Sequence, residues 1–147
     1  MGAPVGSTGD EYEVVVERGK IAEFAAAMRS EDPAYAGPDA VVPPTFLASA
    51  TLWRPASGQV SLGFDRKRLL HGEQEYVFHG PPPRAGQRLR AVDRVTERYS
   101  KPGRRGGEMS FAVVVTEFRD DDGRLVAEAR GTFIERAARP ATEGGGS

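Results

Sequence analysis

The chain contains the run Val42-Pro43-Pro44-Thr45-Phe46-Leu47-Ala48-Ser49-Ala50-Thr51-Leu52-Trp53, in which almost every side chain is apolar or small. Two prolines stand at its start, where a missing N–H costs a helix least. Phe46, Ser49, Ala50 and Trp53 follow at i, i+3, i+4 and i+7, the spacing of one helix face. We therefore predict one short helix over residues 42–53. A helix that is apolar around most of its circumference must be covered on most sides.

The segments on either side of this helix have distinct patterns. A short β-type segment over residues 12–16 and a helix over 18–28 are expected before it. Loops are expected over residues 30–42 and 54–68, which contain Pro and Gly turn signals. Four strand-like segments follow, at residues 72–79, 88–99, 108–118 and 124–136. The simplest way to bury the apolar helix is to wrap an antiparallel sheet around it, which predicts an α+β fold.

Alternation within the last two strands suggests which side chains face the helix. In the third strand the expected inward set is Met109, Phe111, Val113 and Val115. In the fourth strand it is Leu125, Ala127, Ala129, Gly131 and Phe133. Small residues in this second set leave room for the helix or for a ligand.

Composition bounds the function. The chain has 147 residues and suits one domain, and its 39% hydrophobic and 28% charged residues are ordinary for a globular protein. A formal net charge of −1 gives no basic field for nucleic acid or an anionic membrane. There are no cysteines and no apolar run of the roughly 18 residues that span a bilayer. We expect a cytoplasmic protein, with residues 1–10 and 137–147 disordered around a domain at 11–136.

Four short motifs occur in a fixed order. They are Asp32-Pro33-Ala34-Tyr35, Pro43-Pro44-Thr45-Phe46, Leu70-His71-Gly72-Glu73-Gln74-Glu75 and Pro83-Arg84-Ala85-Gly86-Gln87-Arg88-Leu89. Together they resemble the MaoC-like dehydratase family, in its N-terminal-domain-like branch, which includes accessory subunits of mycobacterial (3R)-hydroxyacyl-ACP dehydratases. This resemblance implies a hot-dog fold, in which an antiparallel sheet wraps a central helix.

The resemblance also implies a substrate and a reaction. Family members remove water reversibly from a (3R)-3-hydroxyacyl thioester carried on CoA or acyl carrier protein, and no other cofactor is implied. An Asp and a His separated by four intervening residues, in a loop of the form Asp-x-Asn-Pro-x-His, act as acid and base. At the matching positions this chain has Ser30 and Tyr35. A tyrosine with an ordinary pKa near 10 is a poor base at neutral pH, so the chain departs from the family at its catalytic pair.

Other family features are retained at the central helix. Backbone N–H groups at its start stabilise the enolate-like oxygen in the family, and Thr45 and Phe46 are expected to present them here. Aromatic side chains are expected to line an acyl tunnel beside the helix. The candidate substrate-binding residues are therefore Tyr35, Thr45, Phe46 and Trp53.

An alternative acid–base set surrounds one of the two histidines. His71 has Glu73 two residues on and Asp65 six residues before it. The same residues also suit a strand end or a dimer interface, and structural networks perturb ionisable groups as active sites do. Two histidines without a supporting carboxylate pattern predict no metal site.

Three functions remain open. In the first, the chain is an acyl-thioester-binding subunit that pairs with a second MaoC-type chain bearing the Asp and His. In the second, it is a homodimeric hydratase or thioesterase that uses His71. In the third, it is a ligand-binding domain without turnover. All three expect hot-dog pairing, as a homodimer or a heterodimer, because pairing covers a strand edge of the small domain.

Overall fold

A computed structural model describes residues 2–139 of the chain. Five strands make up the body of the domain: β1 (Tyr12–Val15), β2 (Leu69–Phe78), β3 (Arg88–Pro102), β4 (Glu108–Arg119) and β5 (Leu125–Glu135). The helices are α1 (Arg18–Ala27) and four short 3-10 turns, η1 (Pro33–Tyr35), η2 (Phe46–Leu52), η3 (Ala56–Gly58) and η4 (Arg66–Arg68). All five predicted strands and the predicted first helix are therefore present. Strand β2 starts three residues earlier than expected.

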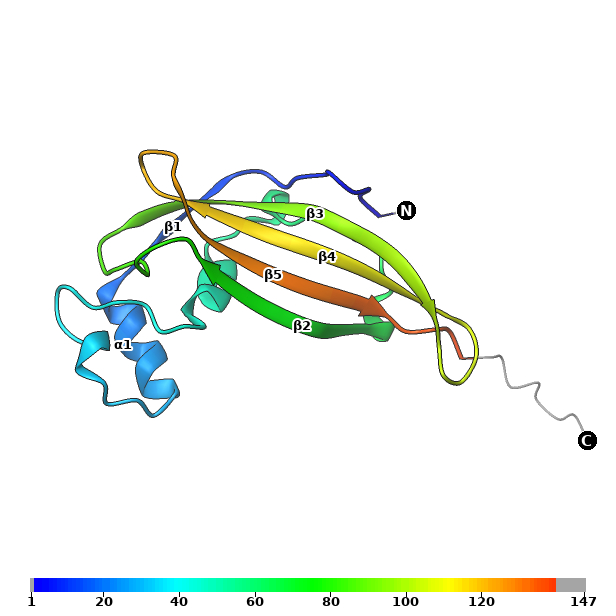
Figure 1. The fold of residues 1–147 in the computed structure, drawn as a ribbon, viewed down its shortest axis with the longest axis horizontal. Coiled ribbons are helices and arrows are strands. Elements are labelled where there is room, and N and C mark those ends of the chain that lie inside the picture. Colours follow the sequence, from blue (N-terminus) through cyan, green and yellow to red (C-terminus); the bar gives the residue numbers. More distant parts are fainter. Residues whose placement is uncertain (1, 140–147) are drawn as a thin grey trace, which may run out of the picture.

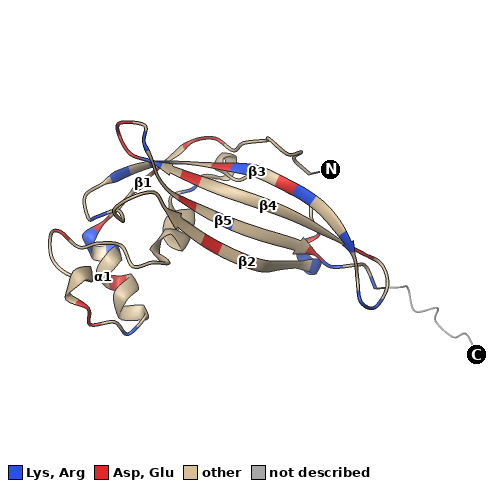
Figure 2. Cartoon of the chain, in the orientation of Figure 1, with Lys and Arg blue, Asp and Glu red and all other residues tan. Residues whose placement is uncertain are grey.

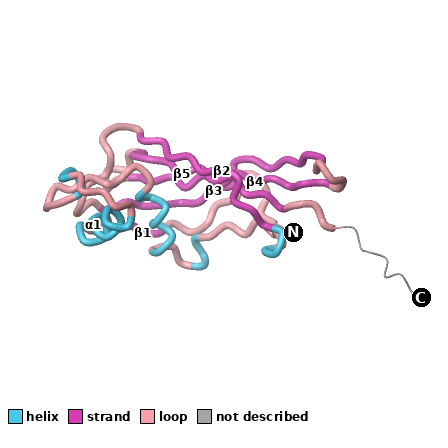
Figure 3. The backbone as a smooth tube through the Cα atoms, turned by 90° about the horizontal axis from the view of Figure 1, so that it is seen from below, coloured by secondary structure: helices cyan, strands magenta, loops and turns pink. Residues whose placement is uncertain are grey.

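The five strands form a single antiparallel sheet in the order β1-β3-β4-β5-β2 (Figure 1). Figure 3 shows that the helices and the long loops lie on one side of this sheet. We call that side the inner face. The strands curve past η2, and this arrangement confirms the predicted hot-dog fold, an α+β fold with a sheet wrapped around a central helical segment.

The register decides which side chains face η2. On β5 the inward set is Ala127, Ala129, Gly131 and Phe133, as predicted for these four. On β4 the prediction was wrong, because the inner face carries Ala112, Val114, Thr116 and Phe118. Odd-numbered and even-numbered residues of β4 are both largely apolar, so alternation alone did not show which set faces inward. Phe111 and Val115 are buried on the outer face, where Phe111 stacks on Tyr99 with ring centroids 4.8 Å apart.

The central helix is shorter and tighter than predicted. Its backbone N–H groups bond three residues back, as Ala48 does to Thr45 and Trp53 does to Ala50, both over 3.1 Å. The Ser49 hydroxyl donates to the Phe46 carbonyl over 2.7 Å, a local bond that competes with α-helical pairing. The result is a 3-10 segment, and not the α-helix over 42–53 that the spacing suggested.

Only one side of η2 is covered within the described residues. Phe46, Leu47 and Ala50 are buried, whereas Leu52 is 68% exposed. Phe46 anchors the segment through an edge-to-face contact with Phe24 of α1, with centroids 5.6 Å apart. The expectation that η2 is covered on most sides is therefore not met by this chain alone.

The N-terminal segment is not the disordered stretch that its composition suggested. Gly6 donates a backbone hydrogen bond to Val95 over 2.8 Å, and Val95 donates to Ser7 over 3.0 Å. Thr8 forms an isolated bridge with Arg94. This segment therefore runs along β3 in line with β1, while the expected disordered tail lies, from residue 140 on, outside the described residues.

Charges of both signs are interspersed over the sheet and loops (Figure 2). The pairing of β3 with β4 has a register shift between Val95 and Glu97. Beyond this shift, Arg98 donates to the carbonyl of Ala3 in the N-terminal segment and to that of Leu62 in the loop before β2. Within residues 2–139, no helix is long and apolar enough to cross a membrane.

Candidate functional site

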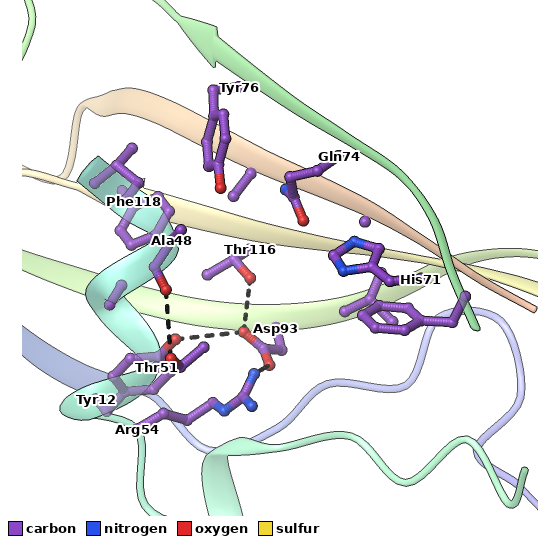
Figure 4. Close-up of a pocket in the computed structure, with 16 residues that line it drawn as sticks. Tyr12, Ala48, Thr51, Arg54, His71, Gln74, Tyr76, Asp93, Thr116 and Phe118 are labelled. Atoms are coloured by element: carbon purple, nitrogen blue, oxygen red, sulfur yellow. Dashed lines mark hydrogen bonds and ion pairs between the residues drawn. The ribbon is translucent and has the colours of Figure 1, made fainter. Parts of the chain in front are cut away.

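A cavity of about 410 Å³ lies between η2 and the inner face of the sheet (Figure 4). From the helical side it is lined by Leu47, Ala48, Ala50, Thr51 and Arg54. From the sheet it is lined by Tyr12, His71, Gln74, Tyr76, Asp93, Val114, Thr116, Phe118, Ala129, Gly131 and Phe133. Ala129 and Gly131 stand where larger side chains would fill this space, as the sequence suggested for this strand.

A buried carboxylate forms the polar centre of this cavity. Asp93 is 1% exposed and is the one charged side chain buried to that extent among the described residues. Its Oδ2 accepts from Arg54 Nη1 over 2.8 Å, and its Oδ1 accepts from Thr116 Oγ1 over 2.8 Å. The Tyr12 hydroxyl lies 3.5 Å from the same Oδ1. A buried charge needs such partners, because unpaired it loses its hydration without compensation.

The backbone explains how these four groups meet. Asp93 and Thr116 are direct partners in the β3–β4 ladder, so their side chains leave the sheet side by side. Tyr12 is paired with Ala91, two residues before Asp93 on the same face. Arg54 follows η2, whose last turn aims it at the sheet (Figure 4). Burial raises the pKa of the Tyr12 phenol, and the Asp93 charge raises it further, so this hydroxyl remains a donor at neutral pH.

Strand β2 contributes three polar side chains to the cavity wall. Gln74 and Tyr76 lie opposite Gly131 and Ala129 of β5. His71 stacks on Phe133, with ring centroids 4.9 Å apart and the planes 18° from parallel. Burial raises the pKa of the Tyr76 phenol. These groups can donate or accept hydrogen bonds. Within residues 2–139 the histidine that is hydrogen-bonded to a carboxylate is His79, with Glu128, and not His71.

A second cavity of about 510 Å³ adjoins the first. The two share four lining residues: Arg54, Asp93, Val114 and Phe133. The loop between η3 and β2 supplies most of its other wall, including Val60, Leu62 and Phe64. The Arg54–Asp93 pair therefore stands at the junction of two neighbouring spaces on the inner face.

The structure separates the alternative acid–base set. His71 lines the first cavity, whereas Glu73 is exposed and pairs with Thr132 on the opposite face. A register shift between His71 and Glu73, at Gly72, puts residues two apart on different faces. Asp65 caps η4, where the Lys67 N–H and the Arg68 side chain hold the pKa of its carboxyl below its usual range. It lines neither cavity.

None of the four candidate substrate-binding residues lines either cavity. Tyr35 and Trp53 pack against the core cluster, and Phe46 is part of it at 1% exposed. The Phe46 N–H is also occupied, since it donates to the Pro43 carbonyl over 3.0 Å. The expectation of a free N–H at Phe46 was therefore wrong, while Thr45 is exposed at the start of η2.

In MaoC-like dehydratases the loop of the form Asp-x-Asn-Pro-x-His carries the catalytic acid and base. In the present chain the matching loop is held by local hydrogen bonds. Ser30 Oγ accepts a hydrogen bond from the Asp32 N–H over 3.3 Å, and Asp32 in turn caps η1 by accepting from the Ala34 N–H over 2.9 Å. Tyr35 ends η1. Neither Ser30 nor Tyr35 borders the cavities. Within residues 2–139 no three His, Asp or Glu side chains gather as metal ligands would.

Sequence reasoning missed the buried cluster. Asp93 is not among the candidate site residues that the sequence motifs indicate. A signal was present, because Leu89, Ala91, Asp93 and Val95 share one parity, which puts a carboxylate among inward apolar residues. Its partner Arg54 is 39 residues away, in a stretch expected only as loop. Nothing local in the sequence joins the two.

The sheet, the short central helix and the cavity between them define a hot-dog domain of the dehydratase type. The profile of the FAS1-like, dehydratase domain region matches residues 3–129, and the chain belongs to that family. Relatives include UPF0336 proteins of Saccharopolyspora erythraea, 34% identical and aligned over 88% of this chain and 86% of the relative, and of Streptomyces coelicolor, 34% identical over 86% and 87%.

Solved structures share the fold. The (3R)-hydroxyacyl-ACP dehydratase HadBC of Mycobacterium tuberculosis superposes with a TM-score of 0.70 at 23% identity, over 91% of this chain and 99% of that one. The ChsH1–ChsH2 complex of the same organism superposes with a TM-score of 0.67 at 17% identity, over 92% of this chain and 88% of that one. An (R)-hydratase of A. caviae superposes with a TM-score of 0.62 at 18% identity, over 89% of this chain and 96% of that one. The resemblance to MaoC-like dehydratases inferred from the four motifs is thereby confirmed.

Proposed function

We propose that this chain is the acyl-thioester-binding subunit of a (3R)-hydroxyacyl thioester dehydratase, and that a second MaoC-type chain supplies the catalytic Asp and His. The observation that supports the proposal is the set of ionisable side chains that line the cavity. Its one carboxylate, Asp93, is occupied by Arg54 and Thr116, and its one histidine, His71, stacks on an aromatic ring. A general acid–base pair needs two groups free to exchange protons with the substrate.

The positions of the family's acid and base support the same proposal. Ser30 and Tyr35 stand there, and both lie outside the cavities. A serine hydroxyl and an ordinary phenol do not exchange protons readily at neutral pH. The chain would then serve the reaction by holding the acyl group and by completing the site of its partner.

The free edge of the sheet offers a place for that partner. Strand β2 is an outer strand, and its residues from Leu69 to Glu75 are exposed. Leu69 and Leu70 on it are 38% and 46% exposed. An open strand edge with exposed apolar side chains is a ready template for pairing. The HadBC and ChsH1–ChsH2 structures, which share this fold, are complexes of two subunits.

A hydration assay tests the proposal. The purified chain is mixed with crotonyl-CoA and with a longer enoyl-CoA, and loss of the enoyl absorbance is followed. We expect no turnover by the chain alone and turnover after co-expression with a dyad-bearing MaoC-type chain. The same partner with its dyad His replaced by Ala is the matched control and should be inactive. Steady turnover by the chain alone would refute the accessory role.

One observation favours a second candidate, a self-sufficient homodimeric hydratase or thioesterase. His71 lines the cavity with its ring stacked on Phe133, and stacking leaves the edge of the ring, which carries both nitrogens, able to face a substrate. Under this alternative His71→Ala abolishes turnover by the chain alone. Under the leading proposal the same substitution alters binding or assembly only, because the partner carries the chemistry.

A further inference from the structure

The wall between the two cavities is charged. Arg54 and Asp93 border both spaces, and their side chains are 22% and 1% exposed. A pocket that accepts only a hydrocarbon chain is lined by apolar groups, because each polar group that loses water there must be compensated. Eight of the sixteen residues around the first cavity carry polar side chains instead. The pocket is therefore built for a ligand with at least one polar group of its own.

Arg54 has hydrogen-bonding capacity left over. A guanidinium carries five N–H donors, and the hydrogen bonds from this one to described residues use Nη1 alone, toward Asp93. Within residues 2–139 no fully buried side-chain nitrogen or oxygen lacks a partner. The other N–H groups of Arg54 are thus accessible atoms, and the two cavities are the spaces that this side chain borders.

Asp93 determines which ligand charge is compatible. Its two oxygens already accept from Arg54 and Thr116, and with Arg54 it forms a neutral pair. A second carboxylate beside this pair would be repelled by Asp93 in surroundings of low dielectric constant. A hydroxyl or carbonyl oxygen meets no such repulsion and accepts a hydrogen bond from a charged donor, which is stronger than one from a neutral donor.

We propose that Arg54 binds a second neutral oxygen on the acyl chain, a hydroxyl or carbonyl group farther from the thioester than the 3-hydroxyl of the proposed substrate, and that the pocket selects acyl groups with this additional oxygen over plain alkyl chains. The inference rests on the proposed function, since it names the substrate class of that same acyl site. Ala129 and Gly131 leave the space for the chain, and Arg54 recognises the oxygen.

The test compares three six-carbon probes by calorimetric titration of the full chain: hexanoyl-CoA, 5-oxohexanoyl-CoA and adipoyl-CoA. We expect the oxo probe to bind about tenfold more tightly than the hexanoyl probe, as one hydrogen bond from a charged donor predicts. Adipoyl-CoA, whose far end is a carboxylate, should bind no more tightly than hexanoyl-CoA.

The double variant Arg54→Met/Asp93→Asn removes both charges together, so that neither remains buried without its partner, and it keeps an acceptor for Thr116. It should bind the oxo and hexanoyl probes within about twofold of each other. Arg88→Met is the matched control, because Arg88 pairs with Glu13 over 3.8 Å on the surface, and it should retain the preference. Should the double variant fail to fold, Arg54→Lys replaces it, and loss of the planar fork should reduce the preference at least threefold.

The outcomes separate the two claims. Equal binding of the oxo and hexanoyl probes to the unaltered chain overturns the inference and leaves acyl-thioester binding in place. Binding of neither probe overturns both. A preference that survives in the double variant or in Arg54→Lys overturns the role of Arg54, and tightest binding of adipoyl-CoA overturns the requirement for a neutral oxygen.

Discussion

Thr116 and Asp93 face each other across the β3–β4 ladder, and the threonine hydroxyl donates to the buried carboxylate over 2.8 Å. Asp93→Ala leaves Arg54 without its anion, and we expect the free energy of unfolding to fall by about 3 kcal/mol. This is less than the largest cost of breaking a wholly buried pair, because the Arg54 side chain is partly exposed to solvent. Thr116→Val removes one donor and should cost about 1–2 kcal/mol. Urea unfolding at neutral pH measures both.

The matched control for this pair is Asp121→Ala, in the exposed turn before β5, which should change stability by less than about 0.5 kcal/mol. An Asp93→Ala variant as stable as this control would show that the cluster contributes nothing to folding. Only its role toward a ligand would then remain.

A second prediction concerns acid stability. The hydrogen bond from His79 over 2.8 Å, helped by the Arg130 charge, holds the pKa of the Glu128 carboxyl below its ordinary value. The unfolded chain therefore binds a proton at higher pH than the folded chain does. The stabilisation is complete above the ordinary glutamate pKa of about 4.3, and it is lost as the pH falls toward the lower folded value.

Glu128→Gln should accordingly flatten the decline of unfolding free energy between about pH 5 and pH 3, followed by urea titrations at a series of pH values. Glu108→Gln, at an exposed strand end, serves as the control and should keep the slope of the unaltered protein. An unchanged slope in Glu128→Gln would mean that this carboxyl titrates alike in both states.

The elements of the fold were predictable because each has a local cause. Strands alternate, turns contain Pro, Gly or Asp-Gly, and the motifs point to one family. The details that failed depend on contacts distant in sequence. Alternation did not orient β4, where Val113, Val114 and Val115 are apolar on both faces, and helical spacing did not reveal the Ser49 hydroxyl bond that accompanies the 3-10 form of η2.

The candidate site was harder to predict for the same reason. The register shift at Gly72 separates His71 from Glu73. A glycine inside a strand often marks such a shift, but the predicted strand began at residue 72, so Gly72 stood at its end. The Arg54–Asp93 pair joins a loop to a strand, so it becomes visible only when the sheet has been assembled. Parity along β3 was the one sequence signal that singled out Asp93.

A third prediction addresses the partner. Leu70 lies on the free edge strand β2 and is 46% exposed, which suits contact with a second hot-dog subunit. Leu70→Asp should weaken assembly with a dyad-bearing chain at least tenfold, measured by sedimentation velocity, because a carboxylate would be desolvated there. Val5→Asp, at a more exposed apolar residue beside β3, should leave assembly unchanged. Equal effects of both variants would argue against pairing through β2.

The last prediction concerns the space that Gly131 provides. A Cβ built on this residue would lie 3.1 Å from a ring carbon of Phe133 and 3.3 Å from the Gln74 side-chain oxygen, at the cavity wall. Gly131→Ala should therefore weaken hexanoyl-CoA binding modestly, and Gly131→Val at least tenfold, since each added methyl group takes volume from the acyl chain. Calorimetric titration measures the series, and circular dichroism checks that the sheet is intact.

Thr132→Val is the matched control for this series, because the neighbouring residue points to the opposite face and its substitution changes volume little. It should bind the probe as the unaltered chain does. A folded Gly131→Val variant with unchanged affinity would place the acyl group elsewhere than in the cavity between η2 and the sheet. The graded loss of affinity from Gly131→Ala to Gly131→Val distinguishes two causes. If the substitutions destabilised the fold, the unfolding temperature would fall together with the affinity. If the added methyl groups only fill the cavity, the affinity falls while the unfolding temperature is unchanged.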